Sequence, residues 1–198
     1  EPVGSSSTIV ARRFREKGLQ PEAAVALCLC AGLVSDTLNL TSPTTTEVDR
    51  DMLLWLSGLA GVDPDEFAEA FFASGSLLLH ADAQAIVGTD RKEFNEDGVF
   101  LSLSQVEETS FKGLSKRKEE LVEELGRLRH EHRYELCAIL VTDIRRHDSV
   151  LLAVGREELL CKLPFGRSGV NEFSAPGVVS RKKQLFPAVC EAIRLSFD

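Results

Sequence analysis

The feature that most constrains the fold of this chain is an almost wholly apolar run, Ala23–Val34. Its composition predicts an α-helix that is hydrophobic on every face, and such a helix has to be buried. We expect Pro21 to open this helix and Asp36 to lie at its C-terminal end. Helices of this kind normally pack against a sheet, but the neighbouring residues show no strand pattern. The sheet is therefore expected to come from a missing upstream segment or from another polypeptide.

Asp36 is the first candidate for chemistry. An ionised carboxylate at that end of the helix faces the negative pole of the helix dipole in a poorly solvated surround. It therefore needs a cation or several hydrogen-bond donors to remain charged, and a metal ion is the obvious candidate. The alternative is that Asp36 hydrogen-bonds the following turn, with Thr37 and Asn39.

The remaining residues up to about 75 also predict helices. The expected spans are Thr8–Lys17, Val48–Ala60 and Phe67–Ala73. Capping boxes mark two of the starts, one formed by Thr44 with Glu47 and the other beginning at Asp63. Gly61 is expected to end the second of these helices.

After Ser74–Ser76 the spacing of the hydrophobic residues changes from the helical period to the alternation of strands. This change predicts a mixed sheet with helices. The expected strands are Arg91–Phe94, Val99–Glu107, Leu136–Thr142, Ser149–Val154 and Gly177–Ser180, and the expected helices are Leu114–Arg129 and Phe186–Ser196. Residues 95–98 (NEDG) predict the hairpin turn between the first two strands. The fold class is therefore α/β, with an α+β second lobe in the order β-β-α-β-β-α-β-α. This order includes one further helix, between Ser149–Val154 and Gly177–Ser180, for which the sequence gives no bounds.

Composition narrows the function classes. A length of 198 residues, 43% of them hydrophobic, is sufficient for one domain or two small ones. The formal net charge of −8 argues against nucleic acid or an anionic membrane as a general partner. Five scattered cysteines indicate reduced thiols in a cytoplasmic protein, and no secretory signal or membrane-spanning run is present in the sequence.

Two basic stretches of the second lobe are further candidates. Arg181 and Lys182 lie in SRKKQ (180–184), directly after a predicted strand and before a helix. Adjacent cations are tolerated most easily where an anion lies between them, although a solvated turn is an equally good explanation. Lys92 lies in DRKEF (90–94), on the first strand of the same lobe, where by itself it is an ordinary surface lysine.

Taken together, several motifs resemble those of one known family. They are PVGSSSTI (2–9), SDTL (35–38) with SPTTT (42–46), DRKEF (90–94), QVE (105–107), VTDI (141–144) and GVVSRKKQ (177–184). In this order they resemble the family II inorganic pyrophosphatases, which belong to the DHH phosphoesterase group, over nearly the whole chain.

The resemblance implies that residues 1–75 are the helical C-terminal part of a DHH domain and that residues 79–198 are a DHHA2 substrate-binding domain. The stretch from Ser74 to about Leu79 would be the hinge between them. In that family, Mn²⁺ or Co²⁺ together with Mg²⁺ is held by the first domain. Asp36 matches its last metal-binding aspartate, and Lys92, Arg181 and Lys182 match the cations of the second domain that hold phosphate.

The activity implied is hydrolysis of pyrophosphate by a metal-bridging hydroxide. The other metal ligands of the family find no match in this sequence, so the isolated chain is expected to hydrolyse pyrophosphate weakly or not at all. The alternative is a non-catalytic module that binds phosphate or polyphosphate, or a related exopolyphosphatase. A homodimer, or association with a missing N-terminal segment, is the expected assembly.

Overall fold

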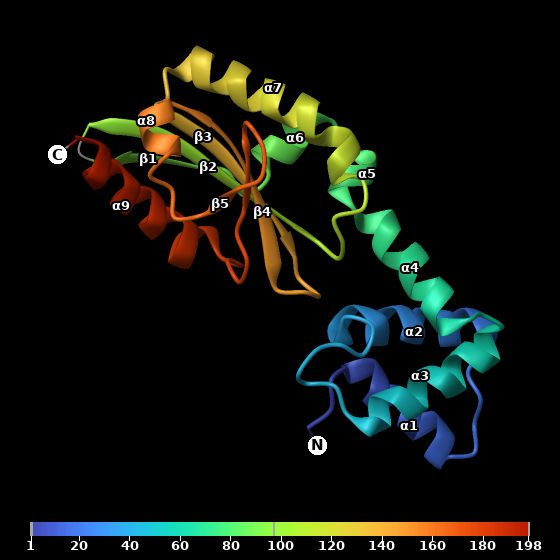
Figure 1. Cartoon of the computed structure of the whole chain (residues 1–198). Helices are drawn as coiled ribbons and strands as arrows, with labels where there is room; N and C mark the ends of the chain where they lie inside the picture. The colour runs from blue at the N-terminus through green and yellow to red at the C-terminus, as the bar shows by residue number, and fades with distance from the viewer. Residues whose placement is uncertain (1, 97, 198) are drawn as a thin grey trace. The chain divides into compact units, whose positions relative to one another are not determined.

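The computed structural model describes residues 2–96 and 98–197, which divide into two units, Glu1–Gly75 and Ser76–Asp198 (Figure 1). The first unit is built from helices. They are α1 (Ser6–Glu16), α2 (Ala23–Thr37), α3 (Glu47–Ala60) and α4 (Pro64–Gly75). All four expected helices are present, and Gly61 ends α3 in a left-handed conformation with φ of 70°. Asp63 accepts hydrogen bonds from the first turn of α4, as a capping residue does.

The apolar helix α2 is buried on one side and exposed on the other, so the expectation that it is buried all round was wrong for the described residues. Cys30 and Leu33 are fully buried in the core of the unit. Val25 and Leu27, by contrast, are 43% and 37% exposed. The reason is that α1, α3 and α4 pack against one side of α2 and leave its opposite face to solvent.

A buried aspartate ties the start of the chain to the start of α3. Asp49 is fully buried and accepts hydrogen bonds from Gly4 N at 2.9 Å and from Thr8 Oγ1 at 2.5 Å. It also accepts from Thr46 N and Thr46 Oγ1, both at 2.7 Å, while Thr46 Oγ1 accepts from Asp49 N. The capping box of α3 is therefore Thr46 with Asp49.

The expected capping box of Thr44 with Glu47 was wrong by two residues. Both pairs have the required spacing, and the burial of Asp49 against Gly4 and Thr8 decides between them. Thr44 instead bonds Ser42 in the preceding turn.

The second unit contains a six-stranded mixed sheet in the order β1-β2-β3-β4-β6-β5. The strands are β1 (Lys92–Glu96), β2 (Val99–Glu108), β3 (Leu136–Asp143), β4 (Asp148–Gly155), β5 (Gly166–Arg167) and β6 (Glu172–Ser174). The pair β2–β3 is parallel, and the other pairs are antiparallel. This sheet confirms the expected mixed α/β class. Asp97 of the expected hairpin turn lies outside the described residues.

Helices cover both faces of this sheet (Figure 1). On one face, α7 (Leu114–His132) buries Leu121 and Leu125 against Ile139 of β3. On the other face, α9 (Phe186–Phe197) packs against the alternate residues of β2, and Phe186 stacks on Phe94 with ring centroids 4.1 Å apart. The period-2 alternation of β2 thus decides which residues face α9.

Several short elements differ from expectation. Residues Leu77–His80 (α5) and Ala83–Gly88 (α6) are helical, although no helix was expected there. Residues Glu157–Leu160 (α8) are helical where the expected order placed a helix without bounds, after the strand Ser149–Val154. The expected strand Gly177–Ser180 is wrong, because the last strand is Glu172–Ser174 and residues 177–180 form a turn and loop. Side chains rather than a neighbouring strand bind the backbone of this loop.

Within the described residues the cysteines form no disulfide bond. Burial raises the pKa of Cys30 to about 11 and that of Cys137 to about 12, so both are inert at neutral pH. Among the described helices, none combines the length and the apolar character needed to cross a bilayer.

Replacing Asp49 is expected to destabilise the helical unit. Asp49→Ala removes the acceptor of four hydrogen bonds, so the free energy of unfolding should fall by about 2–4 kcal/mol in a urea titration. Thr44→Ala is the matched control and should cost less than about 0.5 kcal/mol. Equal losses in the two variants would contradict the assignment of the cap.

The pH dependence of stability provides a second test of Asp49. Burial acts to raise its pKa, but the hydrogen bonds from Thr8, Thr46 and Gly4 outweigh burial, and the pKa lies below the usual value. A lowered folded-state pKa stabilises the protein above the unfolded pKa of about 4, and that stabilisation is lost as the pH falls through the folded pKa. The difference in stability between wild type and Asp49→Asn should therefore shrink as the pH falls below about 4. A constant difference would contradict this account.

Candidate functional site

The loop Gly177–Ser180 is held against the sheet by side chains from two strands, β2 and β4. Gln105 of β2 donates from Nε2 to Val179 O at 3.0 Å and to Thr142 Oγ1 of β3 at 3.2 Å. Ser149 of β4 donates from Oγ to Val178 O at 2.5 Å. These polar groups replace a strand ladder, so the loop has a fixed path without being part of the sheet.

A π-helical turn, Arg181–Leu185, follows this loop and leads into α9. Ser180 caps it by accepting from Lys183 N at 3.2 Å, and Arg181 N donates to Gln105 Oε1 at 2.8 Å. Gln184 folds back on the loop, where it accepts from Val179 N and donates to Gly177 O. Single π turns are rare and are frequent at functional sites, because they change the direction of the side chains they carry. The expectation that these cations follow a strand directly was therefore wrong, since they begin a π turn.

Arg181 is the unusual residue of this turn. Its side chain is only 9% exposed, and its Nη1 lies 3.1 Å from Asp90 Oδ2 as an ion pair. Within the described residues, the buried Nε and Nη1 atoms make no hydrogen bond. Leaving buried charged donors without acceptors is costly, so the arrangement favours an anion that supplies the missing acceptors.

Lys92 lies on the same face of the sheet as this turn. It is opposite Leu103 in the β1–β2 pair, and Leu103 packs in the core beneath α9. Gln105 is two residues after Leu103 and therefore also points to that face. The fold thus brings Lys92 and the Gln105–Arg181 contact to one face of the sheet.

The other cations of the turn are solvated. Lys182 and Lys183 are both exposed, whereas Arg181 is buried. The solvated-turn explanation therefore fits these two lysines by themselves, and the burial of Arg181 is what distinguishes the site. Asp90 has a φ of 43°, in the left-handed region, which is strained for an aspartate and common at functional sites.

Asp36 belongs to the helical unit, at the last turn of α2. Its carboxylate is exposed, so the expected poorly solvated surround was wrong: the end of α2 reaches solvent. The partner of its Oδ2 is Ser5 Oγ, which donates at 2.7 Å from the residue that caps α1. Thr37 and Asn39 bond Leu33 O and Asp65 instead.

The start of α1 lies close to the last turns of α2. A Cβ at Gly32 would lie 2.4 Å from Ser7 Oγ, so a larger residue there would require the Ser7 side chain to move. An exposed carboxylate is a hard oxygen ligand that suits Mn²⁺ or Mg²⁺, and Asp36 fits such an ion as one ligand. No group of three or more His, Cys, Asp or Glu residues that could hold a metal occurs in the described part of the chain.

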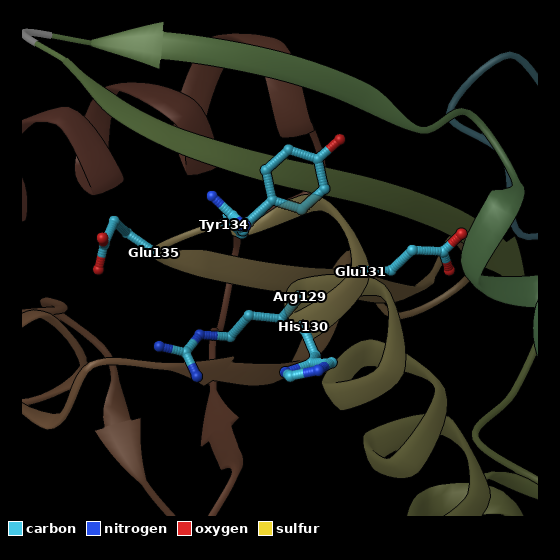
Figure 2. A pocket seen from close by; sticks show the side chains of 6 residues that line it. Arg129, His130, Glu131, Tyr134 and Glu135 are labelled. Carbon is cyan, nitrogen blue, oxygen red and sulfur yellow. The ribbon is translucent and has the colours of Figure 1, made fainter.

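A cavity of the second unit lies elsewhere, at the end of α7. It measures about 520 Å³ and is lined by Arg129–Glu131 and Arg133–Glu135. Figure 2 shows that its side chains diverge, with Tyr134 pointing toward the β1–β2 strands and Arg129 and His130 pointing to the opposite side. Because no set of groups converges on a common point, this depression offers little to a ligand.

Comparison with known proteins identifies the family. Residues 69–192 match the family model described as "DHHA2 domain". The chain belongs to the DHHA2 family. The matched range contains β1, β2 and the π turn, and so Lys92, Gln105 and Arg181.

Relatives of this DHHA2 protein are named as pyrophosphatases. A probable manganese-dependent inorganic pyrophosphatase of Clostridium acetobutylicum is 32% identical over 194 residues, which cover 98% of this chain and 63% of the relative. A cobalt-dependent inorganic pyrophosphatase of Clostridium perfringens is 34% identical, and the match covers 98% of this chain and 35% of the relative. The chain thus spans less than two thirds of the length of these relatives.

A solved structure gives the same result. The crystal structure of a Methanococcus jannaschii protein assigned to family II inorganic pyrophosphatase matches with a TM-score of 0.57 and 28% identity. The match covers 98% of this chain and 66% of that chain.

The contacts around Arg181 were missed at the sequence level. Gln105 and Asp90 lie in the quoted motifs, yet no role was assigned to either. Their approach to Arg181 depends on the pairing of distant strands, so the sequence contained the residues but no spacing signal for the contact.

Proposed function

We propose that this DHHA2 protein acts in metal-dependent hydrolysis of inorganic pyrophosphate to two orthophosphates. The observation that carries the proposal is the buried guanidinium of Arg181, whose Nε and Nη1 make no hydrogen bond within the described residues. A phosphate group supplies several charged acceptors in the geometry that a guanidinium requires. The names of the relatives support pyrophosphate as the anion.

Arg181 is the principal substrate-binding residue in this proposal. Its planar guanidinium holds two phosphate oxygens at once, in a direction fixed by the π turn. Lys92 and Lys182 add point charges from the strand and from the turn. Together these three cations offset the negative charge on the phosphoryl group that is transferred, which is the main contribution a protein makes to phosphoryl transfer.

Asp90 is the residue with which the substrate competes. Its carboxylate is paired with Arg181 Nη1 and is itself 56% exposed, so it can leave at little cost. A phosphate that approaches Arg181 meets this negative charge first. Asp90 thereby holds the guanidinium in place in the free protein and yields to a doubly or more highly charged anion.

Asp36 is the proposed metal ligand of this chain, for Mn²⁺ or Co²⁺ and for Mg²⁺. A metal ion held there would supply a coordinated water of lowered pKa, the nucleophile that hydrolysis requires. Ser5 orients the Asp36 carboxylate by donating to Oδ2. Because a catalytic metal takes several protein ligands and Asp36 provides one, we propose that this chain alone turns over weakly or not at all.

Phosphate or polyphosphate binding without hydrolysis is the second candidate, as is a related exopolyphosphatase activity. It is favoured by the fact that Lys92, Arg181 and Lys182 all lie in the second unit, so an anion can bind there without the carboxylate of the first unit. Binding and hydrolysis are separated by the two experiments that follow.

Binding of magnesium pyrophosphate to the chain tests the cation site by isothermal titration calorimetry. Arg181→Ala should raise the dissociation constant at least tenfold, because it removes a buried bidentate donor. Lys182→Ala should raise it about threefold, as expected for an exposed point charge. Lys183→Ala is the matched control and should bind like the wild type. Equal affinity of the wild type and Arg181→Ala would remove Arg181 from the site.

Phosphate release from pyrophosphate in the presence of Mn²⁺ tests the metal part of the proposal. We expect turnover by the chain alone at least a hundredfold below a typical enzyme value of about 10 s⁻¹. Turnover at about 10 s⁻¹ would show that Asp36 is not the sole metal ligand in this chain.

A further inference from the structure

We propose that Gln105 is a positioning residue that fixes where the guanidinium of Arg181 meets its anion. The inference rests on the proposed role of Arg181 and extends it to a second, buried residue. Gln105 is 8% exposed and lies on β2, between the edge strand β1 and β3 in the sheet. Its partner in the π turn is 76 residues away in sequence.

Both polar atoms of the Gln105 side-chain amide make hydrogen bonds. Oε1 accepts from Arg181 N at 2.8 Å, and Nε2 donates to Val179 O at 3.0 Å and to Thr142 Oγ1 at 3.2 Å. A rotated amide would set a donor against the Arg181 N–H and an acceptor against the Val179 carbonyl, so one orientation is favoured. The side chain therefore acts as a rigid bracket across residues 179–181.

The Gln105 side chain supplies the hydrogen-bond acceptor that the first N–H group of the π turn lacks within the turn. The first N–H groups of a helical turn have no partner within the turn, and Arg181 N is the first of this one. By accepting from it, Gln105 fixes the starting point of the π turn and hence the direction of the Arg181 side chain. Arg181 has no such anchor from its own turn.

The backbone of Gln105 also contacts the residue next to Asp90, which is the ion-pair partner of Arg181. The backbone N of Gln105 donates to Thr89 O at 3.3 Å, next to Asp90. Asp90 is paired with Arg181 Nη1, and Lys92 follows two residues later. Gln105 thus bonds Thr89, the neighbour of Asp90, through its backbone and Arg181 N through its side chain, so it influences the spacing of the anion site.

The loop has other attachments that do not reach Arg181. Ser149 Oγ donates to Val178 O and to Thr142 Oγ1, and Gln184 brackets the loop on its exposed side. Loss of Gln105 therefore leaves residues 177–180 tethered to the sheet. It removes the bonds to Val179 O and Thr142 Oγ1 and, in addition, the one side-chain contact of these that reaches Arg181.

The experiment compares Gln105→Met with Ser149→Ala in the complete chain. Both remove buried hydrogen bonds to the same loop, but only Gln105 contacts Arg181. Gln105→Met should raise the dissociation constant of magnesium pyrophosphate about tenfold, and Ser149→Ala should leave it within about twofold. Thermal unfolding of both variants reports their loss of stability. Equal losses of affinity, or losses that follow stability in both variants, would assign Gln105 a structural role and overturn the proposal.

Gln105→Asn covers the case in which the methionine variant does not fold. Its shorter side chain remains polar but cannot reach Arg181 N and Val179 O together, so it should show the same tenfold loss. Wild-type affinity in Gln105→Asn would overturn the proposal.

Hydrogen exchange tests the contact between Gln105 and the Arg181 amide in the wild-type chain, without any substitution. The Arg181 amide should exchange at least a hundredfold more slowly than an unstructured amide, because it is bonded to Gln105. Rapid exchange at Arg181 would overturn the proposal. Absence of any pyrophosphate binding by the wild-type chain would instead remove the function proposed for Arg181, and the exchange result would still report on the Gln105 contact.

Discussion

The account depends on one buried positive charge. The Arg181 guanidinium is withdrawn from solvent, yet within the described residues its only acidic partner at Nη1 is Asp90, and Nε makes no hydrogen bond. The sheet supports this costly arrangement through Gln105, which bonds Arg181 N and Val179 O and itself donates to Thr142 Oγ1. A guanidinium held in this way is ready to receive an anion once the exposed carboxylate of Asp90 moves aside, and preorganisation of this kind is what stabilises a charged transition state.

The helical unit also contains a buried charged side chain, Asp49, but there the charge has a structural role. There Asp49 is buried with its acceptors satisfied by Gly4, Thr8 and Thr46, so it fixes the structure and has no capacity for a ligand. Asp36, on the exposed end of α2, has a described bond from Ser5 and is accessible. Of two aspartates in one unit, burial and saturation make the first structural, and exposure makes the second a candidate ligand.

Local patterns predicted the regular elements well, and distant contacts explain the differences. The period of β2 and of α7 follows from their own residues, so both were expected nearly to their observed bounds. The cap of α3 was misplaced because Asp49 is buried by partners 41 and 45 residues away. Lys92, Arg181 and Lys182 were chosen from their motifs, but the π turn and the bracket of Gln105 depend on strand pairing, which no single stretch reveals.

The most direct test of the central claim is the ¹⁵N resonance of Arg181 Nε, followed by NMR while magnesium pyrophosphate is added to the chain. Arg181→Lys provides the assignment, since it removes that resonance alone. The account predicts that the Nε–H proton moves downfield and that its exchange with water slows as phosphate oxygens complete the unfilled hydrogen bonds. A resonance that stays unchanged while pyrophosphate binds would show that the anion is held elsewhere and would contradict the account.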